Sequence, residues 1–258
     1  MMEINKIYNM DCLDGLRNTP DNFVDLTITS PPYDNLRDYN GYSFDFENIA
    51  KELYRVTKDG GVIVWIVADA TVDGNETGTS FRQALYFKEI GFKLHDTMIW
   101  HKGGFSAVGA LKTRYGPVFE YMFIFTKGKI KTFNPIKDRE NKHKNKFVKK
   151  TKRLPDGTTK VGKPYISSEY GQRFNVWEMS PQRQKGKEAH PAPFPEKLVR
   201  DHILSWSNEG DLILDPFIGS GTTAKVALLN DRNYVGFEIS SEYCDMTNKR
   251  IEELGKTQ

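Results

Sequence analysis

Cysteine is scarce in this sequence of 258 residues, and long apolar runs are absent from it. The only two cysteines, Cys12 and Cys244, lie far apart, and the five histidines are scattered, so we expect neither a disulfide scaffold nor a structural metal site. No run of about 18 apolar residues occurs, which argues against a membrane-spanning helix. The first residues also lack the apolar core of a signal peptide. We therefore expect a cytoplasmic protein that makes no membrane contact.

Charge is distributed unevenly along the chain. The net charge is only +3, yet residues 127–187 contain 18 Lys and Arg against five Asp and Glu. The remainder contains 19 basic and 29 acidic residues. A basic block on an acidic body is typical of a protein that binds a polyanion. From charge alone, a solvated lysine-rich loop is the alternative interpretation.

Strand-like and helix-like segments alternate through most of the chain, which predicts an open α/β sheet. Residues 134–164 interrupt this pattern, because they contain few large apolar side chains and cannot bury a core of their own. Apolar runs and helical periodicity predict strands over residues 23–29, 62–67, 93–100, 121–126, 211–214 and 234–237, and helices over 45–57, 80–90, 196–206 and 242–254.

A glycine-rich segment follows the predicted strand over residues 211–214. Gly219 and Gly221 permit a tight turn and a close approach of backbone to a ligand. Glu238 lies 19 residues after Gly219, at the end of the next predicted strand. A carboxylate in that place can accept both hydroxyls of a ribose, so the pattern predicts a cofactor that contains adenosine.

The residues around these glycines favour one adenosine cofactor over others. The sequence Gly-x-Gly-x-x-Ala over 219–224 fits a dinucleotide fingerprint loosely, and it lacks the Gly-Lys-Ser/Thr of a P-loop. Asp215 would repel a pyrophosphate but attract a cationic amino-acid group, which favours S-adenosylmethionine. The alternatives are an ordinary glycine-rich turn and a nicotinamide-dependent oxidoreductase.

The residues Thr29-Ser30-Pro31-Pro32-Tyr33 close the predicted strand over 23–29. Proline ends a strand ladder because it lacks an N–H group, but one proline would be enough for that. A stiff segment of this kind could hold a planar nucleic-acid base. The exocyclic amino group of such a base is a poor nucleophile, because its lone pair is conjugated into the ring. The Ser30 hydroxyl and the Pro31 carbonyl could accept its N–H bonds, and Tyr33 could stack on a base flipped out of the duplex. A proline-terminated strand with a surface tyrosine is the alternative.

Together, Ser30-Pro31-Pro32-Tyr33 and Phe217-Ile218-Gly219-Ser220-Gly221 resemble the catalytic and cofactor motifs of the amino-group DNA methyltransferases. The catalytic motif comes first, as in the circularly permuted beta group of that family. This resemblance implies a Rossmann-like α/β methyltransferase fold with a mostly parallel seven-stranded sheet and helices on both faces. It also divides the chain into a catalytic half over 1–127, a basic target-recognition insertion over 128–188 and a cofactor-binding half over 189–258.

The resemblance and the basic block assign roles to individual residues. The expected catalytic residues are Ser30, Pro31, Pro32 and Tyr33. Those expected at S-adenosylmethionine are Asp11, Cys12, Ser30, Asp215, Phe217, Gly219, Ser220, Gly221, Thr222, Thr223, Glu238 and Ser240. Those expected to meet DNA are Lys142, Lys144, Lys146, Lys149, Lys150, Lys152, Arg153, Arg173 and Arg183.

The function that these assignments predict is transfer of a methyl group to N4 of cytosine in duplex DNA, with base flipping. N6 of adenine is the alternative target, because a seryl acceptor can bind either amino group; serine at the first motif position is commoner in the N4-cytosine enzymes. A catalytically inactive DNA-binding protein is the non-enzymatic alternative. Double-stranded DNA is the expected partner and a cognate restriction endonuclease a further candidate, for a monomer or a homodimer.

Overall fold

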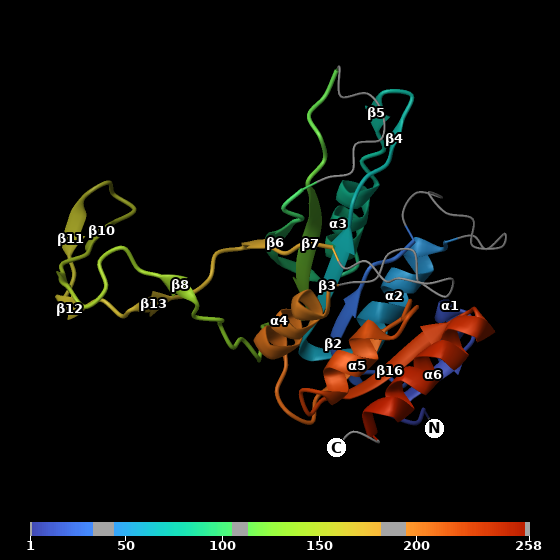
Figure 1. Cartoon of the computed structure of the whole chain (residues 1–258). Helices are drawn as coiled ribbons and strands as arrows, with labels where there is room; N and C mark the ends of the chain where they lie inside the picture. Colours follow the sequence, from blue (N-terminus) through green and yellow to red (C-terminus); the bar gives the residue numbers. More distant parts are fainter. Residues whose placement is uncertain (1, 33–43, 105–112, 182–194, 256–258) are drawn as a thin grey trace. The chain divides into compact units, whose positions relative to one another are not determined.

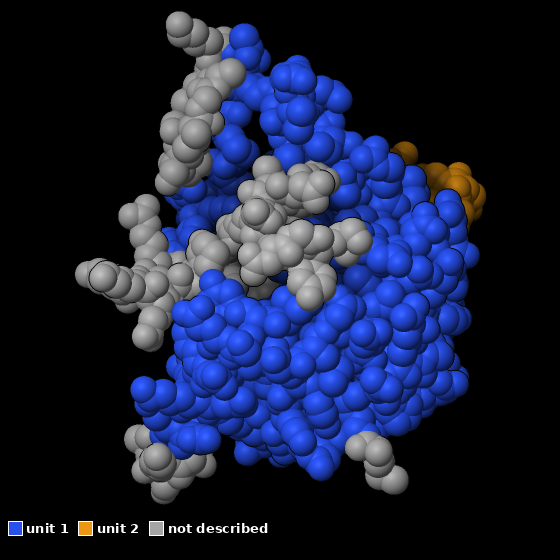
Figure 2. All heavy atoms as spheres, turned by 90° about the vertical axis from the view of Figure 1, so that its right-hand side faces the viewer, with its two compact units in different colours: residues 1–134, 175–258 blue, residues 135–174 orange. Residues whose placement is uncertain are grey.

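The computed structural model describes residues 2–32, 44–104, 113–181 and 195–255 (Figure 1). Tyr33 and Arg183 therefore lie outside the described residues. The chain forms two compact units, Met1–Asn134 with Asn175–Gln258, and Pro135–Phe174 (Figure 2). The smaller unit falls inside the predicted insertion over 128–188.

The larger unit is built on a sheet that has eight strands within the described residues, in the order β1-β16-β15-β2-β3-β7-β6-β14. Strand β7 runs antiparallel to β3 and β6, and the other neighbouring pairs are parallel. This confirms the predicted α/β fold, and β14 adds a strand to the seven expected. The strands are β1 (Lys6–Asn9), β2 (Val24–Thr29), β3 (Thr57–Val67), β6 (Lys93–His101), β7 (Phe119–Thr126), β14 (Val176–Glu178), β15 (Leu212–Asp215) and β16 (Asn233–Glu238).

Helices cover both faces of the sheet (Figure 1). Phe125 of β7 packs on Phe87 of α3, with ring centroids 4.7 Å apart. Met122 points to the opposite face, where its Sδ lies 3.2 Å from Nε2 of His202 in α4. One face carries α1 (Cys12–Asn18), α2 (Phe46–Val56) and α3 (Thr79–Glu89), and the other carries α4 (Glu196–Trp206), α5 (Thr222–Leu228) and α6 (Ser241–Gly255).

The apolar pattern of the sequence explains these elements. The continuous run from Val62 to Val67 predicts a strand covered on both faces, and its residues are at most 2% exposed in β3. Helix α2 follows the predicted amphipathic segment 45–57, and Asp45 caps its N-terminus through a hydrogen bond from the Asn48 amide. None of the helices in the described ranges is long and apolar enough to span a bilayer.

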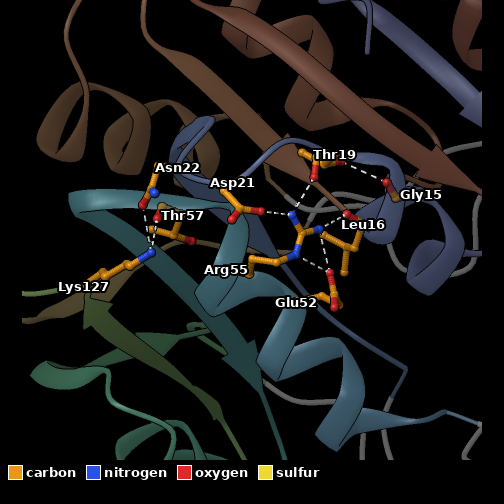
Figure 3. Close-up of polar contacts among 9 residues, drawn as sticks. All are labelled: Gly15, Leu16, Thr19, Asp21, Asn22, Glu52, Arg55, Thr57 and Lys127. Atoms are coloured by element: carbon orange, nitrogen blue, oxygen red, sulfur yellow. Dashed lines mark hydrogen bonds and ion pairs between the residues drawn. The ribbon is translucent and has the colours of Figure 1, made fainter. Parts of the chain in front are cut away.

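A polar network around Arg55 fixes the entry into strand β2 (Figure 3). The guanidinium donates to the carbonyl oxygens of Leu16 and Thr19, at 2.7 and 2.8 Å, near the end of α1. It also forms ion pairs with Asp21 at 2.5 Å and Glu52 at 2.6 Å. These contacts tie α1, α2 and the turn between α1 and β2 together, so the strand that leads to Ser30 starts from an anchored position.

The smaller unit consists of short antiparallel strand pairs and has almost no interior. Ser167 is its one buried residue, in agreement with the prediction that this segment cannot bury a core. The pairs are β8 (Arg139–Glu140) with β13 (Tyr170–Gly171), β9 (Phe147–Val148) with β12 (Tyr165–Ile166), and β10 (Thr151–Arg153) with β11 (Thr159–Val161). A further hairpin, β4 (Thr71–Val72) with β5 (Asn75–Glu76), belongs to the larger unit.

Candidate active site

The two sequence motifs meet at the carboxyl edge of neighbouring strands. Strands β2 and β15 are parallel and adjacent, with Leu214 opposite Thr27. The segments that follow these two strands therefore leave the sheet at the same edge. There the Thr29 hydroxyl donates a hydrogen bond of 2.7 Å to Oδ1 of Asp215. The segment Ser30-Pro31-Pro32 and the glycine-rich loop therefore begin from one joined point, although Tyr33 lies beyond the described residues.

Asp215 holds three separate segments together. Its Oδ1 also accepts from the Phe217 amide at 3.1 Å, and its Oδ2 accepts from the Thr223 hydroxyl at 2.7 Å. The side chain is almost fully buried, and this burial raises the pKa of Asp215 to about 6 in spite of the three donors. Both oxygens are thus engaged inside the protein, and the carboxylate orients the loop that the sequence placed beside a cofactor.

The loop after β15 needs its glycines for two physical reasons. Gly219 has a φ of 49° and Gly221 a φ of 74°, which is the left-handed region. A Cβ on Gly221 would also lie only 2.0 Å from Cγ2 of Thr247 in α6. Helix α6 holds the loop in return, since the Thr247 hydroxyl donates to the Gly219 carbonyl at 2.9 Å and Arg250 donates to the Ser220 carbonyl at 2.9 Å.

Glu238 closes the far side of this loop from the end of β16. Its Oε2 accepts from the Gly219 amide at 3.0 Å, and its Oε1 accepts from the Ser240 amide at 2.9 Å. Burial raises the pKa of Glu238. Each carboxylate oxygen can accept more than one hydrogen bond, so two acceptor positions remain for the hydroxyls of a ribose. The chemistry of this half-buried carboxylate, beside backbone that carries no Cβ, fits an adenosine cofactor.

Asp11 and Cys12 lie at the same edge, one strand further along. Strand β1 runs parallel to β16 with Asn9 opposite Glu238, and the Met10 amide donates to the Glu238 carbonyl at 3.0 Å. Asp11 caps helix α1, with its Oδ1 accepting from the amide two residues on at 2.8 Å. Burial raises the pKa of the Cys12 thiol to about 12. The thiol is therefore protonated at neutral pH and unsuited to act as a nucleophile.

The structure thus brings together most residues that the sequence predicted for catalysis and cofactor binding. They lie at or directly after the carboxyl ends of four neighbouring strands, β1, β16, β15 and β2. Of the predicted DNA contacts, those from Lys142 to Arg173 belong to the smaller unit. Within that unit Arg173 pairs with Asp138.

Sequence reasoning missed some residues that shape the site. Thr29 directly precedes the proline motif but carried no role in the prediction. Thr247 and Arg250 lie in a helix whose only signal was its periodicity. Phe44 lies against Phe217, with ring centroids 5.7 Å apart, and also had no role. Within the described residues, no cluster of His, Cys, Asp and Glu has the arrangement of a metal site.

Comparisons with known proteins agree with this geometry. Residues 24–249 match the family model described as DNA methylase, which covers N6- and N4-specific enzymes. The orphan methyltransferase M.BamHII of Bacillus amyloliquefaciens is 59% identical over 242 residues, 91% of each chain. The type II methyltransferase M1.MboII of Moraxella bovis is 31% identical over 274 residues, 98% of this chain and 99% of that one.

Solved structures share the fold at lower sequence identity. The cytosine-N4-specific PvuII DNA methyltransferase superposes with a TM-score of 0.69 at 21% identity, over 97% of this chain and 87% of that one. The complex of M1.HpyAVI with S-adenosylmethionine gives a TM-score of 0.62 at 22% identity, over 95% and 98% of the two chains. The Rossmann-like methyltransferase fold expected from the sequence is thereby confirmed.

Proposed function

This chain belongs to the family of N6- and N4-specific DNA methylases and uses S-adenosylmethionine, and we propose that it methylates N4 of cytosine at a specific site in duplex DNA. The observation that carries the proposal is the hydrogen bond between Thr29 and Asp215. It joins the residue directly before the proline motif to the start of the cofactor loop, as in-line transfer between two bound groups requires. Family membership excludes the nicotinamide-dependent alternative.

The acceptor base is held, in this proposal, by the segment after β2. The Ser30 hydroxyl and the Pro31 carbonyl accept the two N–H bonds of the exocyclic amine, which draws the nitrogen toward tetrahedral geometry and frees its lone pair. The prolines fix the direction of that carbonyl, because their φ angles are restricted. Tyr33 stacks on the flipped base. Serine at position 30 supports cytosine as the target, and adenine N6 is the outcome that would contradict it.

The cofactor is held by the opposite side of the same edge. Glu238 accepts the ribose hydroxyls, Asp11 meets the adenine, and the backbone around Gly219 and Gly221 allows close approach. When bound, S-adenosylmethionine supplies an electrophilic methyl group on a sulfonium. The further proposed contacts are Cys12, Ser30, Asp215, Phe217, Ser220, Thr222, Thr223 and Ser240.

The basic residues of the smaller unit neutralise DNA phosphates in this proposal. Such contacts make affinity fall as salt concentration rises and carry no sequence information by themselves. A cognate restriction endonuclease is a candidate partner, but the word orphan in the name of the relative at 59% identity favours an enzyme that works without one. We propose that the enzyme works in the cytoplasm. It is a monomer or a homodimer, and analytical ultracentrifugation would distinguish these two states.

The experiment that tests the proposal is methyl transfer from labelled S-adenosylmethionine to unmethylated genomic DNA, followed by mass spectrometry of the nucleosides. The proposal predicts N4-methylcytosine. N6-methyladenine would contradict the assignment of the base while leaving the enzyme class intact. No methylated nucleoside from a protein that binds S-adenosylhomocysteine would contradict DNA as the substrate.

A further inference from the structure

The smaller unit exposes large apolar side chains that a solvated loop would not need. Six of its residues are large, apolar and at least 40% exposed, and no core lies beneath them. Exposed apolar side chains that lie side by side commonly mark an interaction surface, whereas single ones need no explanation. The six exposed apolar residues of the smaller unit are Phe147, Val161, Tyr165, Ile166, Tyr170 and Phe174.

Two of these rings already have a cation from the same unit against them. The Nζ of Lys150 lies 5.4 Å from the ring centroid of Tyr165, and the guanidinium carbon of Arg139 lies 4.5 Å from that of Phe174. These cation–π contacts explain why the two rings lie at a charged, solvent-exposed surface.

Phe147 and Ile166 form a different arrangement. They are direct partners across the antiparallel pair of β9 and β12, so their side chains share one face. Phe147 is 68% exposed and Ile166 is 70% exposed. This face therefore presents two adjacent bulky apolar groups to solvent, side by side on a hydrogen-bonded pair of strands.

The charge around this pair indicates the chemistry of its partner. Residues 135–174 contain 12 Lys and Arg against four Asp and Glu. Lys146 and Lys149 flank Phe147 closely in the sequence, and both are exposed. A polyanion that also offers apolar surface fits this combination. Duplex DNA is such a polyanion, and its apolar surface is formed by the faces of the stacked bases.

We infer that Phe147 and Ile166 act as an apolar wedge that enters between base steps of the duplex and lowers the cost of flipping the target base. This inference rests on the proposed function, because only a base-flipping enzyme needs the stack opened. Lysines such as Lys146 and Lys149 hold the phosphates on either side. The two side chains occupy the gap that opens in the stack, where neighbouring bases would otherwise face water.

The test uses the full-length enzyme and a short duplex that carries the sequence found to be methylated, with 2-aminopurine beside the target base. Its fluorescence rises when the base unstacks. The variants are Phe147→Ala, Ile166→Ala and the double variant. Val161→Ala is the matched control, because Val161 is 65% exposed and lies in a different strand pair, that of β10 with β11.

The wedge predicts that wild type and Val161→Ala raise the fluorescence equally, while the double variant loses most of the rise. Methylation by the double variant falls by about tenfold or more. A duplex in which the target base is mispaired restores its rate, because that base is already unstacked. Since no phosphate contact is removed, the salt dependence of binding keeps its slope, whereas Lys149→Ala lowers the slope by about one.

An unchanged fluorescence rise and rate in the double variant would overturn the wedge. So would a rate that stays low on the mispaired duplex, or a loss of thermal stability or of oligomer mass, since each would show that the pair packs against protein instead. A wild-type enzyme that methylates no DNA would instead refute the proposed function, so the two failures are distinguishable.

Discussion

The Thr29 hydroxyl lies 2.7 Å from Oδ1 of Asp215 and joins two segments that are 186 residues apart in the chain. Thr29 is the last residue of β2 and Asp215 the last residue of β15. The bond is buried, so it is not weakened by competition from water. It couples the position of the segment proposed to bind the amine to that of the loop proposed to bind the cofactor.

Replacing Thr29 by Val tests this coupling. The change keeps the shape of the side chain but removes one donor to a buried carboxylate, so we expect a loss of about 1–3 kcal/mol in the free energy of unfolding. The rate of methyl transfer should fall by between about tenfold and a hundredfold, because the following Ser30 loses its fixed position. Chemical denaturation and single-turnover kinetics measure the two effects.

Thr27 offers the matched control for that variant. It lies on the same strand and is equally buried, and its hydroxyl has no hydrogen-bond partner among the described residues. Thr27→Val should therefore leave stability unchanged or raise it, because a buried unpaired hydroxyl is itself unfavourable. Equal losses in the two variants would show that the Thr29–Asp215 bond contributes nothing specific.

The buried carboxyl of Asp215 should make stability depend on pH. Its pKa is raised from 3.8 to about 6 in the folded protein, so folding favours the protonated form. The contribution of this group to stability is therefore fully present below about pH 4 and is lost as the pH rises through about 6. In Asp215→Asn this dependence should disappear, and the difference in unfolding free energy between the two proteins should change across that window.

The pKa of Glu238 is raised too, and besides burial the charge of Glu238 contributes to the raised pKa of Asp215, so Asp215→Asn is compared with wild type at each pH. Urea denaturation at a series of pH values provides the measurement. A constant difference between wild type and Asp215→Asn from pH 4 to pH 7 would show that the carboxyl of Asp215 is not perturbed by its burial.

A methyl group on Gly221 should be far more damaging than one on Gly74. Both residues have a positive φ, 74° and 76°, so both alanine variants carry the backbone strain of about 1–2 kcal/mol. Only at Gly221 does the new Cβ meet another atom, Cγ2 of Thr247 at 2.0 Å, whereas nothing lies within 4 Å at Gly74.

Gly221→Ala should therefore lose more stability than Gly74→Ala and should also lose stabilisation by S-adenosylhomocysteine, because the loop must move. Thermal unfolding with and without S-adenosylhomocysteine separates these effects. If both variants keep the full shift on adding the cofactor product, the loop is not the cofactor site.

Replacing Glu238 by Gln should weaken cofactor binding. The amide retains the shape of the carboxylate but loses its charge, and charge-assisted hydrogen bonds are about twice as strong as neutral ones. We expect the Kd for S-adenosylhomocysteine to rise by about tenfold or more. Calorimetry measures this, with Glu242→Gln as the control, because Glu242 is an exposed residue in the first turn of α6. The same Kd in both variants would remove Glu238 from the site.

The sequence predicted most elements of the larger unit because burial leaves a periodic pattern. Helix α4 has the bounds expected from its apolar spacing, and the run from Val62 to Val67 is a buried strand. Trp65 and Trp100, which lie in the strands predicted over 62–67 and 93–100, are 0% and 5% exposed.

Other features depended on contacts that no local pattern encodes. The bond from Thr29 to Asp215 requires that β2 and β15 be neighbours, which strand order alone decides. Strand β14 is three residues long, too short for a period. It joins the sheet because Trp177 packs against His202, with ring centroids 4.6 Å apart. The strands of the smaller unit are two or three residues long, so they too are too short to show a period.

The most direct test of the central claim is the single-turnover rate of Ser30→Ala, measured beside its Kd for S-adenosylhomocysteine. If the segment after β2 binds the amine and the loop after β15 binds the cofactor, the rate should fall by about a hundredfold or more while the Kd stays within about twofold of wild type. A variant that transfers methyl groups at the wild-type rate would contradict the assignment of Ser30, and with it the placement of the reaction at this edge of the sheet.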